Sequence, residues 1–134
     1  MADMRDLIEK FPEQISAAVT DMQNKDAGLH KEVSSGFSPN GVLILGMGGS
    51  GIGGAIASDI LSHDSTIPVV ANSDYLIPGW VSNNTLVLAC SYSGNTEETI
   101  EAVTSSHERG AKIAVITSGG LLGALAEKHN WPFV

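Results

Sequence analysis

The amino-acid sequence predicts an α/β fold: a three-layer αβα sandwich with a doubly wound parallel sheet, preceded by N-terminal helices. Two observations predict it. The short strands expected from residue 41 onward are apolar along their whole length, as a sheet covered on both faces requires. Helical segments alternate with these strands, and such alternation implies right-handed crossovers between parallel strands.

The first element is an N-terminal helical segment over residues 1–27. Asp3 suits its N-cap, and Pro12 predicts either a kink or a second helix that the proline opens. The loop-forming composition of residues 27–40 predicts a loop, in which His30 is expected to be solvated. Apolar side chains recur along the segment at helical spacing and are expected to be core or interface: Met4, Leu7, Ile8, Phe11, Ile15, Val19 and Met22.

Residues 41–134 are expected to form the parallel α/β core. The helix predicted for 96–110 ends on Gly110, a residue suited to the position after a helix end. Because no internal repeat or linker is visible, residues 1–134 are predicted to be a single domain, truncated inside its fifth strand. Strands are predicted at 41–45, 66–72, 85–90, 111–117 and, as a beginning, 131–134, with helices at 50–63, 96–110 and 121–129.

Composition excludes several classes of function. The formal net charge is −8 with only seven lysines and arginines, which argues against nucleic acid as a partner. No apolar run approaches the roughly 20 residues of a membrane helix, so no membrane partner is expected. The single cysteine, Cys90, rules out an internal disulfide and favours a cytoplasmic setting. An anionic ligand would have to be held by uncharged groups.

The glycine-rich stretch GMGGSGIGG, residues 46–54, follows the first predicted strand. Glycines let backbone N–H groups converge on an anion, the following helix adds its positive N-terminal dipole, and Ser50 adds a hydroxyl. The stretch also satisfies G-x-G-x-x-G, and Asp74 is placed for the ribose hydroxyls of NAD. A dinucleotide site and a tight packing turn therefore remain alternatives here.

The hydroxyl-rich stretch CSYSGNTEET, residues 90–99, follows the third predicted strand. Ser91, Ser93 and Thr96 place three hydroxyls within six residues at the start of a helix. The alternative is a capped helix with incidental serines, and the TSGG of residues 117–120 is equally compatible with an ordinary turn. Because ligands of such sheets bind at the carboxyl ends of the strands, the stretches predict a site for a monophosphate on a polyhydroxyl group. A second phosphate loop argues against NAD, and no P-loop motif is present.

These motifs resemble the SIS (sugar isomerase) domain, most closely the N-terminal half of bifunctional phosphoglucose/phosphomannose isomerases, with FPEQI at 11–15 as weaker support. The resemblance implies a flavodoxin-like fold, no cofactor or metal, and a homodimer or a second SIS domain as partner. It implies interconversion of glucose 6-phosphate or mannose 6-phosphate with fructose 6-phosphate, by ring opening and then proton transfer between C1 and C2 by a glutamate base through a cis-enediol. The alternative is a non-catalytic phosphosugar-sensing SIS module. The implied substrate-binding residues are Ser91, Ser93 and Thr96 for the phosphate, and Gly48, Gly49 and Ser50 beside the sugar.

The catalytic residues are not identified in this chain. The resemblance places the base glutamate and the site arginine beyond Val134, so the chain is expected to bind sugar phosphate weakly and to turn over little or nothing. Leu121 stands where relatives often carry a basic residue, and Cys90 is expected to be a structural thiol. Surface or helix-end positions are expected for the other titratable candidates: Glu97, Glu98, Glu101, His63, His107 and His129.

Overall fold

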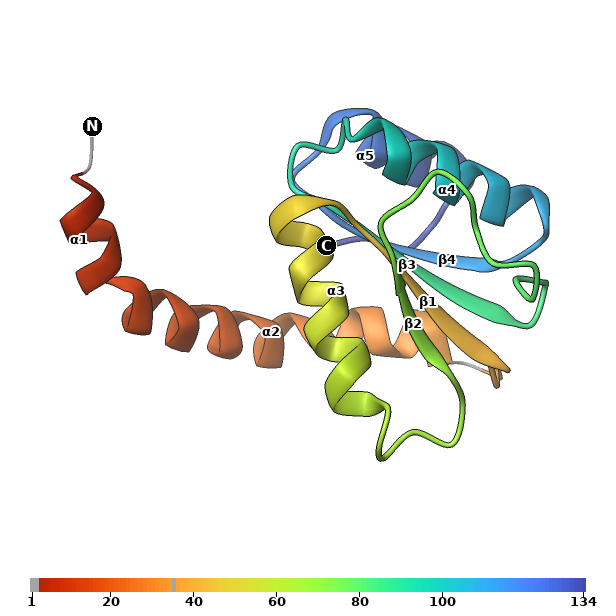
Figure 1. Ribbon diagram of the computed structural model, residues 1–134, viewed down its shortest axis with the longest axis horizontal. Coiled ribbons are helices and arrows are strands. Elements are labelled where there is room, and N and C mark those ends of the chain that lie inside the picture. The colour runs from red at the N-terminus through yellow and green to blue at the C-terminus, as the bar shows by residue number, and fades with distance from the viewer. Residues whose placement is uncertain (1–2, 35) are drawn as a thin grey trace. The chain divides into compact units, whose positions relative to one another are not determined.

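The computed structural model describes the backbone of residues 3–34 and 36–134, and their side chains apart from those of residues 25–34. The chain divides into two compact units, Met1–Ser35 and Gly36–Val134, and the second carries the sheet (Figure 1). The division falls within residues 27–40, the stretch that the sequence predicts to connect the helical segment to the α/β core.

The first unit consists of α1, Met4–Glu9, and α2, Phe11–Ser34. The helices separate at Lys10, and Pro12 stands in the first turn of α2, where its missing N–H has no helical partner to lose. A second helix near Pro12, one of the two alternatives, is therefore confirmed. Asp3 occupies the N-cap of α1 with an extended backbone, although its side chain makes no cap hydrogen bond.

The loop predicted for residues 27–40 is wrong over residues 27–34, which continue α2 to Ser34. Gly28 suggested a break, but one glycine costs a helix only about 1 kcal/mol, and most of its neighbours favour a helix. Residues 36–40 are non-helical, as predicted. The side chain of His30 lies outside the described residues.

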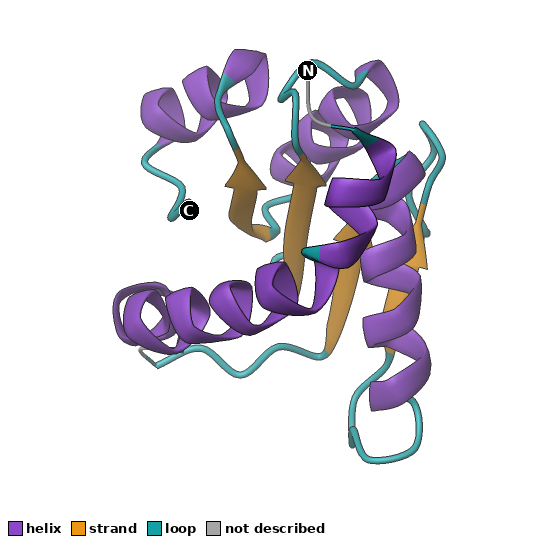
Figure 2. Cartoon of the chain, turned by 90° about the vertical axis from the view of Figure 1, so that its left-hand side faces the viewer, coloured by secondary structure: helices purple, strands orange, loops and turns teal. Residues whose placement is uncertain are grey.

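The sheet contains β1 (Gly41–Leu45), β2 (Val69–Asn72), β3 (Thr85–Ser91) and β4 (Lys112–Thr117), in the order β2-β1-β3-β4. All three pairings are parallel, and the strand arrows of Figure 2 point the same way. β2 begins after Pro68, later than predicted, since proline has no N–H to give to the ladder. The parallel α/β fold is thus confirmed.

The predicted fifth strand begins beside β4. Val115 and Phe133 form a parallel bridge, and the Thr117 N–H donates to the carbonyl of Val134 at 3.0 Å. The full strand order is therefore 2-1-3-4 followed by residues 132–134, as in a flavodoxin-like sheet.

Three helices cover the sheet: α3 (Gly48–Leu61), α4 (Glu97–Glu108) and α5 (Gly120–His129). α4 and α5 lie on one side of the sheet and α3 on the other (Figure 1), as right-handed crossovers in opposite directions require. α4 ends before Gly110, whose φ of +82° is the predicted helix stop. None of the helices in the described ranges has the length and apolar character needed to cross a bilayer.

The core lies between the sheet and the α4–α5 layer. Along β3, every second side chain is buried toward this layer, whereas Leu86, Leu88 and Cys90 are only half-buried on the α3 side. This packing of the sheet against α4 and α5 sets the position of the carboxyl ends of the strands. The buried cluster includes Leu43, Leu45, Val87, Ala89, Val103, Val115, Leu122, Ala126 and Trp131.

Candidate functional site

The carboxyl ends of β1 and β3 lie side by side, where the strand order reverses. The chain leaves β1 toward β2 and leaves β3 toward β4, so the two connections diverge from this point. Doubly wound sheets bind their ligands in the crevice that results. The glycine-rich stretch 46–54 and the hydroxyl-rich stretch 91–96, hereafter the serine loop, both begin there.

The glycines of the β1–α3 turn fall into two groups according to their surroundings. A Cβ on Gly51 would lie 2.7 Å from the carbonyl oxygen of Gly46, so packing requires glycine there. Gly48 and Gly49 are exposed, and a Cβ on either would meet no atom within 4 Å. Gly48 has a left-handed φ of +55°, but neither backbone nor packing demands glycine at position 49. Close packing therefore explains the glycine at position 51 but not the glycine at position 49.

The serine loop is organised by its own hydroxyls. Ser91 Oγ and Thr96 Oγ1 lie 2.9 Å apart, and Ser91 Oγ accepts a second hydrogen bond from the Gly94 N–H at 3.1 Å. Ser91 is buried, whereas Ser93 is exposed and accepts from the Asn95 N–H at 3.2 Å. The structure thus brings Ser91 and Thr96 together and leaves Ser93 on the surface of the same loop.

The starts of α3 and α4 carry no side-chain cap. Met47 precedes α3, and Thr96 occupies the N-cap of α4, but neither side chain makes a cap hydrogen bond. Thr96 instead turns its hydroxyl toward Ser91. Helix N-termini present unpaired N–H groups and a partial positive charge, so these two starts are suited to an anion.

The start of α5 differs, because the serine loop already occupies its amides. The Leu121 N–H donates to Asn95 Oδ1 at 3.0 Å, and the Leu122 N–H donates to the carbonyl of Gly94 at 2.8 Å. The Ser118 N–H donates to the carbonyl of Tyr92 at 3.2 Å. Of the two alternatives for TSGG, the structure therefore supports a turn that holds the serine loop.

A pocket of about 410 Å³ opens beside the serine loop. Ser50 and Ser91, which come from different motifs, both line it, and its volume suits a small organic ligand. Gly48, Gly49, Ser93 and Thr96 do not line this pocket. The complete lining is Ser50, Cys90, Ser91, Tyr92, Ile116, Thr117 and Ser118.

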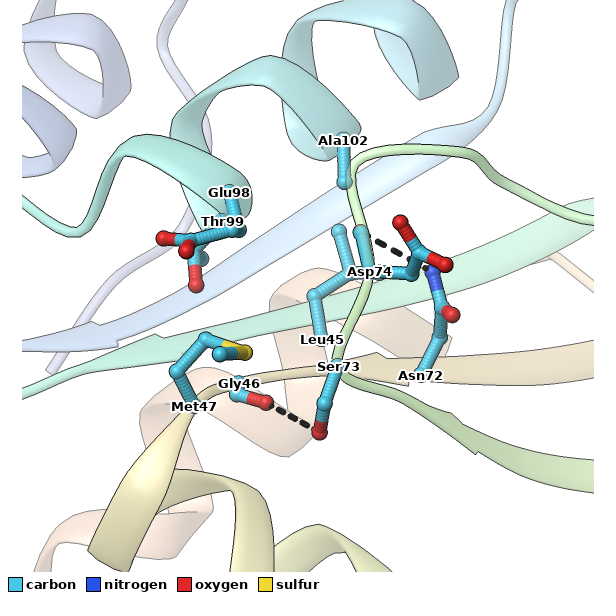
Figure 3. A pocket seen from close by; sticks show the side chains of 9 residues that line it. All are labelled: Leu45, Gly46, Met47, Asn72, Ser73, Asp74, Glu98, Thr99 and Ala102. Carbon is cyan, nitrogen blue, oxygen red and sulfur yellow. Dashed lines mark hydrogen bonds between the residues drawn. The ribbon is translucent and has the colours of Figure 1, made fainter.

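A second, narrow crevice, with essentially no volume accessible to a water molecule, lies between the β1–α3 turn, the end of β2 and the start of α4 (Figure 3). Ser73 Oγ donates to the carbonyl of Gly46 at 2.7 Å along one wall. Thr99 Oγ1 is buried there and has no hydrogen-bond partner among the described residues. Asp74 stands at the end of β2, as an NAD site would need, but the crevice has essentially no water-accessible volume, whereas ligand pockets typically have about 300–1,000 Å³.

The titratable side chains near the serine loop give no evidence of acid–base chemistry. Burial raises the pKa of the Cys90 thiol to about 11, so it stays protonated at neutral pH, as expected for a structural thiol. The pKa of Tyr75 is raised by burial and then by the carboxylates of Glu97 and Glu98, which places these glutamates near Tyr75. Within the described ranges, no group of three or more His, Cys, Asp or Glu side chains could hold a metal ion.

His107 and His129 lie at the far ends of α4 and α5, away from the strand ends that carry the motifs. Their rings lie 4.4 Å apart between centroids, and both contact Trp131. Burial and then the neighbouring His107 lower the pKa of His129. The expected helix-end positions are confirmed, but ring contacts hold these two side chains.

Comparison with known proteins identifies the family. The model of the SIS domain matches residues 37–126, which include both motifs. The chain belongs to the SIS domain family. It is 39% identical over 131 residues to the bifunctional phosphoglucose/phosphomannose isomerase of Caldicellulosiruptor bescii, covering 98% of this chain and 37% of the relative. It is 49% identical over 84 residues to the enzyme of that name from Thermoplasma acidophilum, covering 63% of this chain and 26% of the relative.

Solved SIS-domain structures share the fold of this chain. A candidate phosphosugar isomerase from Clostridium difficile 630 superposes with a TM-score of 0.77 at 20% identity, covering all of this chain and 37% of that one. The NanR protein of Vibrio vulnificus, in complex with ManNAc-6P, superposes with a TM-score of 0.63 at 20% identity, covering 90% and 50%. The predicted SIS fold is confirmed, and the chain covers 37% and 26% of the length of the two isomerases that it matches above.

Sequence reasoning did not find the part that Asn95 and Ser118 play in this SIS domain. Asn95 lies in the hydroxyl-rich stretch and Ser118 in TSGG, but the sequence pattern indicates no hydrogen-bond partner for either. Their partners lie 26 residues away along the chain, so no local pattern signals them. The Thr99 hydroxyl, which has no partner in the part of the chain that the structure describes, was likewise not predictable, because burial is a property of the folded chain.

Proposed function

We propose that this SIS domain binds the phosphate of a hexose 6-phosphate and belongs to an aldose–ketose isomerase. The enzyme would interconvert glucose 6-phosphate or mannose 6-phosphate with fructose 6-phosphate. The names of the relatives support this activity. The observation that carries the phosphate site is the pair of uncapped helix starts, α3 and α4, beside the hydroxyls of the serine loop.

The phosphate binds through the hydroxyls of Ser91, Ser93 and Thr96 and the free amides at the start of α4. Ser91 already contacts Thr96, so an incoming oxygen meets donors that are in place. Neutral hydrogen-bond donors and a helix dipole suffice to bind an anion, even on a protein of net charge −8. The serine loop, residues 91–96, contains no carboxylate, and Glu97 and Glu98 follow it in the first turn of α4.

The sugar lies along Gly48, Gly49 and Ser50, next to the phosphate. The exposed backbone of Gly48 and Gly49 leaves room for a ring or an open chain, and Ser50 shares a pocket with Ser91. Isomerisation then moves a proton between C1 and C2 of the opened sugar. We assign no catalytic base to this chain, because no Asp, Glu or His side chain in the described ranges lines the pocket that Ser50 and Ser91 share, and Cys90 stays protonated.

The domain works in the cytoplasm beside a second SIS domain or a second copy of itself. On the α/β unit, Ile52, Ile56 and Ile60 are exposed at four-residue spacing along α3, a stripe suited to packing against another helix. Gly53 lies on the same helix with open space above it, which would let a partner approach closely.

The phosphate site is tested by titrating the chain with glucose 6-phosphate, fructose 6-phosphate and inorganic phosphate in a calorimeter. Thr96→Val removes one hydroxyl at nearly constant volume and is expected to weaken binding of all three about tenfold. Thr104→Val is the matched control, because Thr104 lies in the same helix and its hydroxyl bonds only the carbonyl of Ile100, at 2.7 Å. Equal binding by the two variants would contradict the site.

A coupled isomerase assay on the natural full-length product tests the reaction. Turnover of glucose 6-phosphate or mannose 6-phosphate would support the isomerase. Tight binding of a phosphosugar without turnover would instead favour the sensing module, which the isomerase relatives do not favour.

A further inference from the structure

Asn95 bridges two segments that are far apart in the sequence. Its Oδ1 accepts from the Leu121 N–H at 3.0 Å, and its Nδ2 donates to the carbonyl of Ser93 at 3.2 Å. This arrangement fixes the orientation of the amide, because a flipped group would set donor against donor and acceptor against acceptor. One side chain thus ties the start of α5 to the tip of the serine loop.

Further hydrogen bonds join the same two segments. The Leu122 N–H donates to the carbonyl of Gly94 at 2.8 Å. Both the N–H and the hydroxyl of Ser118 donate to the carbonyl of Tyr92. The β4–α5 turn and the first residues of α5 therefore hold Tyr92, Gly94 and Asn95 directly, and they hold Ser93 through Asn95.

The two backbones also touch where glycines face each other. Gly94 and Gly120 have left-handed φ values of +69° and +65°. A Cβ on Gly94 would collide with the carbonyl of Gly119, and one on Gly120 would lie 2.9 Å from Asn95 Oδ1. With no side chain between them, the segments pack backbone to backbone, and a shift of one must move the other.

We propose that Asn95 is a positioning residue, which locks the serine loop to the start of α5 so that its hydroxyls meet a phosphate in a fixed geometry. This inference rests on the proposed phosphate site. Asn95 itself does not contact the ligand, and the amides of α5 serve as a support for the loop.

Positioning matters here because, among the described residues, neither the serine loop nor the pocket beside it contains a lysine or an arginine. A hydrogen bond from a hydroxyl or an amide weakens steeply as its angle falls below about 120°. A lysine ammonium attracts phosphate as a point charge and tolerates such misalignment. Three neutral hydroxyls on a loop must instead be held still before the ligand arrives, since otherwise binding bears the cost of ordering them.

The first test needs no ligand and measures amide hydrogen exchange by NMR. In Asn95→Ala, the Leu122 N–H is expected to exchange at least about tenfold faster than in the wild-type chain. Its own partner is the carbonyl of Gly94, so it is affected only if the loss of the Asn95 side chain releases the whole serine loop. Asn95→Asp keeps the acceptor for Leu121 and is expected to retain protection of that amide. Faster exchange at Leu121 alone, with Leu122 unchanged, would show that Asn95 does not hold the loop and would overturn the inference.

The second test titrates the chain with inorganic phosphate and with glucose 6-phosphate. Asn95→Ala is expected to weaken the binding of both ligands about five- to tenfold and by the same factor, because the misplaced serine-loop hydroxyls contact only the phosphate group that the two ligands share. Asn84→Ala is the matched control: Asn84 is exposed just before the same strand, β3, at its opposite end, and is expected to leave both affinities unchanged.

The outcomes separate the inference from the proposed function. Wild-type affinity in Asn95→Ala would overturn the positioning role and leave the phosphate site standing. A wild-type chain that binds neither inorganic phosphate nor glucose 6-phosphate would overturn the phosphate site, and the positioning role with it.

Discussion

Gly49 offers a substitution whose effects on stability and on binding should have opposite signs. It is the second residue of α3, it is exposed, and a Cβ there would meet no atom within 4 Å. Replacing glycine with alanine in a helix typically stabilises it by about 0.5–1 kcal/mol. Because the first helical turn constrains the backbone only partly, we expect about 0.5 kcal/mol for Gly49→Ala, a rise in Tm of about 1–3 °C.

The same methyl group should harm ligand binding. If the sugar lies against the bare backbone of Gly49, the added carbon occupies its place, and affinity for glucose 6-phosphate should fall at least about tenfold, or 1.4 kcal/mol. The affinity for inorganic phosphate, which has no sugar, should fall much less. Calorimetric unfolding gives the stability, and titration with the two ligands gives the affinities.

Two other glycines of α3 provide the controls. Gly53→Ala adds a methyl with equal room one turn later and should raise stability similarly without changing affinity. Gly51→Ala should destabilise the domain by about 1–3 kcal/mol, because its Cβ would lie 2.7 Å from the carbonyl oxygen of Gly46, which cannot yield. If Gly49→Ala binds glucose 6-phosphate as tightly as Gly53→Ala does, the sugar does not lie at Gly49.

Four further outcomes follow from the structure. Thr99→Val should stabilise the domain by about 1 kcal/mol in urea unfolding, because it replaces a buried hydroxyl without a partner among the described residues; destabilisation would reveal a hidden partner. Iodoacetamide at pH 8 should modify Cys90 at least about tenfold more slowly in the folded than in the unfolded chain, since burial raises the pKa of the thiol to about 11; equal rates would contradict that burial. Ile56→Lys should shift a dimer toward monomer in sedimentation, and an unchanged dimer would place the interface elsewhere. His129 has a lowered pKa in the fold, so its contribution to stability is present above pH 6.5 and is lost as the pH falls; His129→Gln should flatten this acid slope in denaturation curves, and an unchanged slope would assign it to other groups.

The sequence predicted the sheet well because its signals are local. Each strand is a short apolar run bounded by turn residues, and the helix stop at Gly110 needs only one residue with a left-handed φ. The loop wrongly predicted for residues 27–34 also rested on a local signal, and there the signal was misleading. Gly28 and the serines that follow suggested a loop, yet a single glycine is too weak a signal to end a helix of this length.

The candidate site was predictable in its location but not in its internal contacts. Strand ends with glycines or hydroxyls can be found by counting along the chain, and Ser91 and Thr96 do meet. Counting along the chain could not show that the first amides of α5 are hydrogen-bonded to the serine loop, whereas the starts of α3 and α4 carry no side-chain cap. Whether an amide at the start of α5 is free depends on Asn95, which lies 26 residues away along the chain and is brought close by the pairing of β3 with β4.

That difference between helix starts links ligand binding to stability. An unsatisfied N-cap typically costs a helix about 0.5–2 kcal/mol, and Thr96, a good capping residue, leaves α4 uncapped by turning to Ser91. A phosphate at this point would supply the missing acceptors, so part of its binding energy replaces a cap that the protein lacks. Ligand should therefore raise the free energy of unfolding by RT ln(1 + [L]/Kd). It should also protect the first amides of α4 more than those of α5, which Asn95 and Gly94 already hold.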